Sequence, residues 1–318
     1  MVLLCSFPQT SLAQYIWNPN NNNGQTNWSD RNVWDASEPA NNASGTFTFS
    51  SDVNKLNNFN DFTGITMTSL VFSSGAGAYN LYGNAVTLNG NVTNNSSTNQ
   101  TIHFGVTISG QRTIQTATNN ITFNGAIGGS GGITKTGQGT LTLTGNNSYS
   151  GNLDVQGGVV DLQTGPAAGG IAALSVSSGA TLLVSTSNQV NNTAPVTLSG
   201  GTIRRASGVS EVFGSLSLTS ASFLDYGTGT AGTLTFGSYT PSSLLTVNNF
   251  FQGNTLTFQS NLTDSISNTN LFIFDNNISY SWDSGSSTFT VTAIPEPNTA
   301  IVVGIILIFI IALTIRNL

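Results

Sequence analysis

Short segments in which apolar residues alternate with Thr, Ser or Asn follow one another along most of this chain. Successive side chains of a β-strand point to opposite faces, so this pattern predicts strands with one apolar and one polar face. Gly or Asn marks most gaps between segments, and no helical periodicity intervenes. Two architectures remain: a sandwich or barrel of antiparallel hairpins, or a β-solenoid in which the chain winds in coils. Examples of the segments are Val86/Leu88, Ile102/Phe104/Val106/Ile108, Leu141/Leu143, Val160/Leu162 and Leu182/Val184.

Charged residues are scarce, and their scarcity excludes some classes of protein. Only 6% of the 318 residues are charged, the formal net charge is −6, and Lys and Arg together number 7. Such a chain offers no basic footprint, so we expect no nucleic-acid partner. Thr, Ser, Asn and Gly take the place of charged residues, as suits exposed strand positions and tight corners.

One segment decides between the two architectures. Residues 129–162 read GSGGITKTGQGTLTLTGNNSYSGNLDVQGGVVDL. This segment closely resembles the autotransporter-associated β-strand repeat of bacterial surface passengers. The resemblance implies an all-β fold, a right-handed parallel β-helix, which we expect over residues 61–249. In such a stack, Leu, Ile, Val and Phe form an inner column, and Gly or Asn occupies the corners.

Both ends of a solenoid are open sheet edges that need a cover. We expect residues 14–60 to cover the first coil through Trp17, Trp28 and Trp34. A sugar-stacking site on these three rings is the alternative.

The opposite end carries a second group of aromatic residues, and we expect residues 250–293 to form a β cap there. The aromatic residues of this region include Phe272, Phe274, Trp282 and Phe289.

A catalytic centre is not evident from the sequence. Glycosidases need two facing carboxylates, and the close pair of the repeat, Asp154 and Asp161, is separated by a Gly-Gly turn that places them on different strands. Arg204 and Arg205 are neighbours on one strand and point to opposite faces. His103 has no second His or Cys with which to build a triad or a zinc site. We therefore predict no enzyme, no metal and no cofactor.

The Gly-rich stretch that leads to Lys135 superficially resembles a phosphate loop. Lys135 does not directly follow a Gly, and no helix pattern comes after it, so we attribute this similarity to chance.

The C-terminal residues predict an anchor. Residues 300–315 are apolar and uncharged, which favours insertion into a bilayer as a single transmembrane helix. Pro295-Glu296-Pro297 precedes this segment and Arg316 follows it. Together, residues 294–318 resemble the PEP-CTERM sorting signal of Gram-negative bacteria that make polysaccharide, which implies recognition by an exosortase. That family usually ends in a cluster of basic residues, whereas Arg316 stands alone here.

The N-terminus predicts export. Residues 1–13 resemble a signal peptide with small residues before a cleavage site between Ala13 and Gln14. The usual basic residues before the apolar run are missing, so we expect the true start to lie upstream. Export would use the general secretion machinery. Cys5 falls in this removable segment, and the mature chain would have no disulfide.

The sequence thus predicts a membrane-anchored structural or adhesive protein of the cell envelope, surface or extracellular matrix, associated with extracellular polysaccharide. Two alternatives are a β-helical polysaccharide lyase or hydrolase and a sugar-binding module, each on the same anchor.

Overall fold

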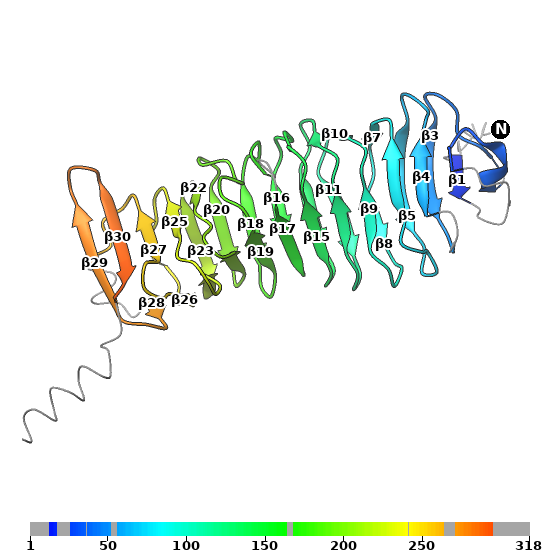
Figure 1. The fold of residues 1–318 in the computed structure, drawn as a ribbon. Coiled ribbons are helices and arrows are strands. Elements are labelled where there is room, and N and C mark those ends of the chain that lie inside the picture. Colours follow the sequence, from blue (N-terminus) through cyan, green and yellow to red (C-terminus); the bar gives the residue numbers. More distant parts are fainter. Residues whose placement is uncertain are drawn as a thin grey trace, which may run out of the picture.

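The computed structural model is an elongated stack of coils with strands running across its long axis (Figure 1). It describes residues 13–17, 26–35, 37–51, 56–163, 168–240, 242–263 and 271–294. Parallel pairing between successive coils dominates. The prediction of a parallel β-solenoid is therefore confirmed, and the hairpin architecture is excluded.

Three sheets form the walls of the stack. The eleven-stranded sheet contains β4 (Asn57–Asn60), β6 (Asn80–Gly83), β9 (Gln100–Ile102), β12 (Ile121–Phe123), β15 (Thr140–Leu143), β17 (Val159–Leu162), β19 (Thr181–Val184), β21 (Thr202–Arg205), β24 (Ser222–Asp225), β26 (Leu245–Asn248) and β28 (Phe272–Phe274). The fourteen-stranded sheet contains β1 (Ala13–Trp17), β2 (Trp34–Asp35), β3 (Ser44–Phe49), β5 (Thr66–Phe72), β7 (Val86–Leu88), β8 (Val92–Asn94), β10 (Val106–Ile108), β11 (Arg112–Thr116), β13 (Ile127–Gly128), β14 (Ile133–Thr136), β16 (Leu153–Val155), β18 (Leu174–Ser177), β20 (Val196–Ser199) and β23 (Leu216–Ser220). The five-stranded sheet contains β22 (Glu211–Phe213), β25 (Thr233–Phe236), β27 (Thr255–Phe258), β29 (Ile278–Asp283) and β30 (Thr288–Ala293).

The register places equivalent residues of successive coils against each other. Leu141 of β15 pairs with Val160 of β17, which pairs with Leu182 of β19. All three side chains are fully buried, while the side chains next to them on each strand point outward. The period-two pattern of the sequence thus becomes one continuous apolar column inside the coils.

Aromatic side chains fill the N-terminal end of this column. Trp17 and Trp28 have an exposed fraction of 0%, and Trp34, beside the short 3₁₀ helix η1 (Arg31–Val33), is also buried. Trp28 stacks on Phe47, and the indole N–H of Trp34 donates to the carbonyl oxygen of Trp28 at 2.8 Å. These three rings are core residues and present no face on which a sugar could stack.

A hairpin lies against the last coil at the other end. Strands β29 and β30 pair antiparallel, and β30 pairs antiparallel with β27. Phe289 is fully buried, whereas Phe272, Phe274 and Trp282 are partly buried against the same core.

The expected anchor cannot be compared with this fold, because residues 295–318 lie outside the described part of the chain. Within the described ranges, no helix has the length and apolar character needed to cross a membrane.

Candidate functional site: an outer groove on the eleven-stranded sheet

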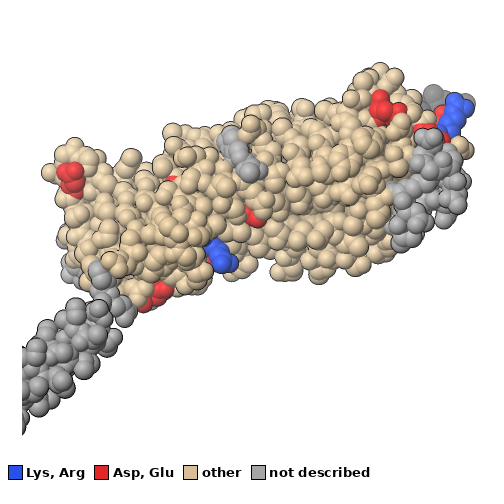
Figure 2. All heavy atoms as spheres, viewed as in Figure 1, with Lys and Arg blue, Asp and Glu red and all other residues tan. Residues whose placement is uncertain are grey.

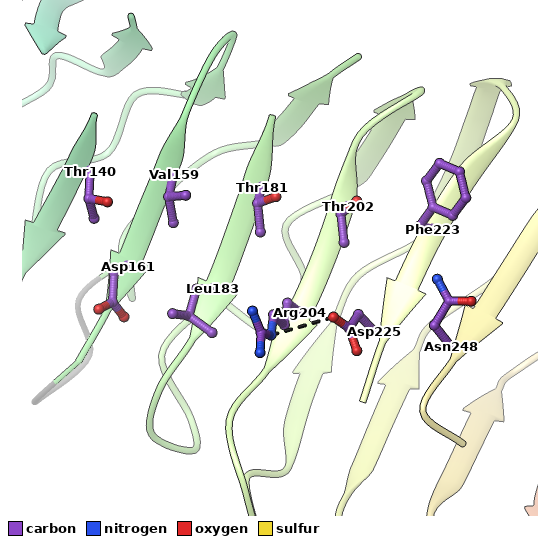
Figure 3. A pocket seen from close by; sticks show the side chains of 10 residues that line it. All are labelled: Thr140, Val159, Asp161, Thr181, Leu183, Thr202, Arg204, Phe223, Asp225 and Asn248. Atoms are coloured by element: carbon purple, nitrogen blue, oxygen red, sulfur yellow. Dashed lines mark ion pairs between the residues drawn. The ribbon is translucent and has the colours of Figure 1, made fainter. Parts of the chain in front are cut away.

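Outward-facing side chains of six neighbouring strands line a groove of about 560 Å³ on the eleven-stranded sheet (Figure 3). Strands β15, β17, β19, β21, β24 and β26 each contribute to it, and the parallel register aligns their side chains in two rows. The first row consists of Thr140, Val159, Thr181, Thr202 and Phe223, and the second of Asp161, Leu183, Arg204, Asp225 and Asn248. The groove therefore runs along the solenoid axis, across the strands.

The charges of the groove are compensated by neighbouring groups. Arg204 Nε lies 3.4 Å from Asp225 Oδ2, and about half of the Arg204 side chain is exposed. Asp225 Oδ1 also accepts hydrogen bonds from the backbone N–H of Gly227 and from the side-chain amide of Asn249. With Asp161, the groove holds two carboxylates and one guanidinium group.

Asp161 is held in a similar way. Its two carboxylate oxygens accept hydrogen bonds from Gln163 Nε2 at 2.8 Å and Ser185 Oγ at 2.6 Å. Ser185 belongs to the following coil, so Asp161 connects two coils at the rim of the groove.

A large apolar side chain is exposed within these polar surroundings. Phe223 has an exposed fraction of 38% and lies between Thr202 and Thr246 in the register of the sheet. Leu183 and Val159 supply smaller apolar patches in the same groove. The groove thus combines hydroxyl, amide and charged groups with an aromatic platform.

The carboxylates of the groove do not form the pair that glycoside hydrolysis requires. Asp161 and Asp225 lie three strands apart, or roughly 14 Å at the usual strand spacing. The two carboxylates of an inverting glycosidase are separated by about 6.5–9.5 Å, and those of a retaining enzyme are closer. Asp275 follows β28, and its carboxylate accepts hydrogen bonds from the backbone N–H groups of Asn249 and Phe250, which engages it in a turn.

Asp154 does not complete a pair either. It lies on β16 of the fourteen-stranded sheet, whereas Asp161 lies on β17 of the eleven-stranded sheet. This separation confirms the prediction that the two residues occupy different strands. Among the described residues, no three His, Cys, Asp or Glu side chains are grouped closely enough to hold a metal ion.

His103 belongs to an outward-facing aromatic row nearer the N-terminal end of the same sheet. Its ring stacks on Tyr82 with a centroid distance of 4.1 Å, and Tyr82 stacks on Phe59 at 5.1 Å. Asn124 Nδ2 donates to His103 Nδ1 at 3.2 Å, so a neutral His103 carries its proton on Nε2. Partial burial lowers the pKa of His103, which favours this neutral form.

The buried position of Lys135 was not predicted. Lys135 is fully buried, and its Nζ donates to the carbonyl oxygens of Thr136, Gly137 and Gly157 at 2.9–3.0 Å. Burial lowers the pKa of Lys135 to about 8. The sequence did contain a signal, because Lys135 stands two residues after Ile133, at an inward position of the alternation. No phosphate loop forms at this position.

Arg205 points inward while Arg204 points outward, which confirms their predicted opposite directions. The buried Arg205 Nη1 donates to the carbonyl oxygens of Ala206 and Thr230, and Nη2 donates to Asn254 Oδ1. Its guanidinium carbon lies 4.9 Å from the centroid of the Tyr226 ring. These contacts span successive coils, so Arg205 is a structural link.

The structure describes the predicted cleavage residues but not the predicted sorting residues. Pro295, Glu296, Pro297 and Arg316 lie outside the described residues. Ala13 and Gln14 are the first two residues of β1 and are exposed. Cleavage between them stays a prediction.

Comparison with known proteins supports the repeat. Residues 133–162 match the family model of the passenger-associated-transport-repeat. The chain is also 40% identical over 90 residues to the adhesin BmaC autotransporter of Brucella suis biovar 1 (strain 1330). This alignment covers 28% of the present chain and 2% of that much longer protein. No solved structure matches the chain.

Proposed function

We propose that this chain is an exported, non-enzymatic protein of a Gram-negative bacterium that displays an adhesive or structural β-solenoid at the cell surface. The observation that carries the proposal is a parallel solenoid whose residues 133–162 match a repeat of transported passengers. Similarity over 90 residues to a protein named as an adhesin supports the same role. The wide separation of Asp161 and Asp225 favours binding over hydrolysis.

The proposal includes how the solenoid reaches the surface and stays there. Residues 1–13 would direct the chain into the general secretion machinery, and residues 300–315 would hold it in the inner membrane while an exosortase recognises Pro295-Glu296-Pro297. Association with extracellular polysaccharide is part of the same proposal.

We take the coil to be right-handed, because nearly all parallel strand connections have that hand.

Protease treatment of intact cells that express an epitope-tagged chain tests the location. We expect external protease to remove the tag, and we expect Glu296→Ala to reduce its appearance at the surface. Glu38→Ala is the matched control, because it removes a carboxylate that pairs with Arg31 on the outside of the solenoid. A chain that stays in the cytoplasm with residues 1–13 intact would contradict the proposal.

A further inference from the structure

We propose that the outer groove of the eleven-stranded sheet binds a linear, uncharged glycan that lies along the solenoid axis. This inference rests on the proposed function, because it supplies the ligand class and the site for a surface adhesive protein. Four features of the groove support it: its length, its lining, its charge and the pairing of its strands.

The length of the groove fits a linear polymer. Its lining residues come from six consecutive strands, β15 to β26, which are separated by five strand spacings or roughly 24 Å. Two strand spacings come to roughly 9.5 Å, which is about the length of one disaccharide in an extended glycan. The outward side chains of every second strand would thus meet equivalent sugars.

The lining of the groove fits the two surfaces of a sugar ring. Hydroxyl groups of Thr181 and Thr202 and the amide of Asn248 can exchange hydrogen bonds with the hydroxyls at the ring edge. The exposed Phe223 ring offers a flat apolar surface with a negative face for the C–H groups of the sugar.

Phe223 lies outside the internal aromatic stack of the solenoid. Inside the solenoid, Phe213, Phe236 and Phe258 stack on one another in successive coils. Phe223 instead pairs with Thr202 and Thr246 on its two sides. It is therefore a single exposed aromatic residue in a row of Thr and Val.

Charge argues against an anionic polymer. The groove contains Asp161 and Asp225 but one guanidinium group, which already faces Asp225. The chain as a whole carries a formal net charge of −6. Figure 2 shows that charged atoms are sparse on the face of the molecule in view. The lining of the groove contains one basic side chain, Arg204, so no basic patch attracts uronates or phosphates there.

Strand pairing argues against a peptide ligand. Each of the strands β15, β17, β19, β21, β24 and β26 pairs with a strand on both sides. Their backbone N–H and C=O groups are therefore used within the sheet, and an extended peptide could not bind by adding a strand.

Isothermal titration calorimetry on the full chain tests the proposal. The probes are soluble oligosaccharides of six or more sugars: β-1,4-glucan, β-1,3-glucan, xylan and mannan, with oligogalacturonate as the anionic comparison. We expect at least one neutral probe to bind, and we expect Phe223→Ala to weaken that binding by about tenfold or more. Thr202→Lys, which puts a long side chain in the middle of the groove, should also abolish binding.

Phe59→Ala is the matched control, because Phe59 is an exposed aromatic residue of the same sheet that lies outside the groove. It should bind like the wild type. Circular dichroism and surface display of each variant establish that it folds and is exported.

The proposal is overturned if no neutral probe binds, if both groove variants bind like the wild type, or if oligogalacturonate binds more tightly than every neutral probe. Each of these binding results would leave the proposed function intact, because that function is tested separately by the protease accessibility of the chain. Conversely, a wild-type chain retained in the cytoplasm would refute the proposed function even if the groove binds a glycan in solution.

Discussion

Glu211 links the stability of the solenoid to pH. Its side chain on β22 is 1% exposed, and its two carboxylate oxygens accept hydrogen bonds from the backbone N–H groups of Gln189 and Val190 at 2.8 and 3.1 Å. Burial raises the pKa of Glu211 to about 7, and the backbone donors only partly oppose this shift. The carboxyl thus holds its proton more tightly in the folded chain than in the unfolded chain.

The sign and size of the pH effect follow from the pKa. Because the folded pKa is the higher one, the stabilising contribution is fully present below pH 4.5 and is lost as the pH rises through 7. A difference of about 2.5 pH units at 1.36 kcal/mol each gives a loss of about 3 kcal/mol. Glu211→Gln removes the titration but places an amide N–H₂ against a backbone N–H, which makes the variant ~1–3 kcal/mol less stable than the wild type with Glu211 protonated, a cost that does not itself change with pH.

We therefore expect the free energy of opening of wild type and Glu211→Gln to change differently with pH. The wild type should lose about 3 kcal/mol relative to the variant between pH 4 and pH 8. Hydrogen exchange at the amides of Gln189 and Val190, corrected for the intrinsic exchange rate at each pH, measures this opening. The local measurement suits a solenoid, whose coils need not unfold as one unit. Parallel pH profiles for the two proteins would refute the reasoning.

Three further substitutions test contacts between coils. Lys135→Met takes the ammonium donor away from three carbonyl oxygens, and this loss exceeds the gain from removing a buried charge. We expect urea denaturation to show that the free energy of unfolding falls by ~2 kcal/mol at pH 7. Gly137→Ala places a methyl group against the carbonyl oxygen of Thr116 at φ +79°, so the melting temperature should fall and an unchanged value would contradict the close approach. Trp34→Phe removes the hydrogen bond to Trp28 and should cost ~1 kcal/mol by urea denaturation, whereas a stability equal to wild type would show that this bond contributes nothing.

The main features of the fold could be predicted from the sequence because they depend on local alternation. Leu141 and Val160 stand at apolar positions of two segments, and the structure pairs them across successive coils. The positions of Asp154 and Asp161 on separate strands followed from the Gly-Gly turn between them. The inward and outward faces needed only the period of a strand and the position of a turn, whereas parallel coils rather than hairpins were expected from the resemblance of residues 129–162 to a known repeat.

The groove could not be predicted, because it depends on the register across six coils of unequal length. The step from Leu141 to Val160 is 160 − 141 = 19 residues, and the step from Val160 to Leu182 is 182 − 160 = 22 residues. Turns absorb the difference without disturbing the sheet. A column such as Asp161, Leu183 and Arg204 therefore has no fixed spacing in the sequence.

The buried charges escaped prediction for a different reason, and that reason indicates what they do. A sequence pattern sorts residues by hydrophobicity, whereas Lys135 and Glu211 are tolerated inside because backbone groups surround them. The pKa of Lys135 is lowered to about 8 and that of Glu211 is raised to about 7, so both charges lower stability near neutral pH.

The charge itself therefore does not stabilise the fold, and what these residues contribute lies in the hydrogen bonds they make to the backbone. Leu, Ile and Val are nearly interchangeable along the inner column, so an apolar stack alone discriminates weakly between one register and another. Lys135 binds the carbonyl oxygen of Gly157 in the next coil, and Glu211 binds the amides of Gln189 and Val190 in the preceding one. A slipped register would leave each charge buried without these partners, which is far more costly than the native arrangement. We infer that the buried charges define which coil packs on which. Hydrogen exchange in Lys135→Met and Glu211→Gln tests this role, and variants in which each coil exchanges as uniformly as in the wild type would refute it.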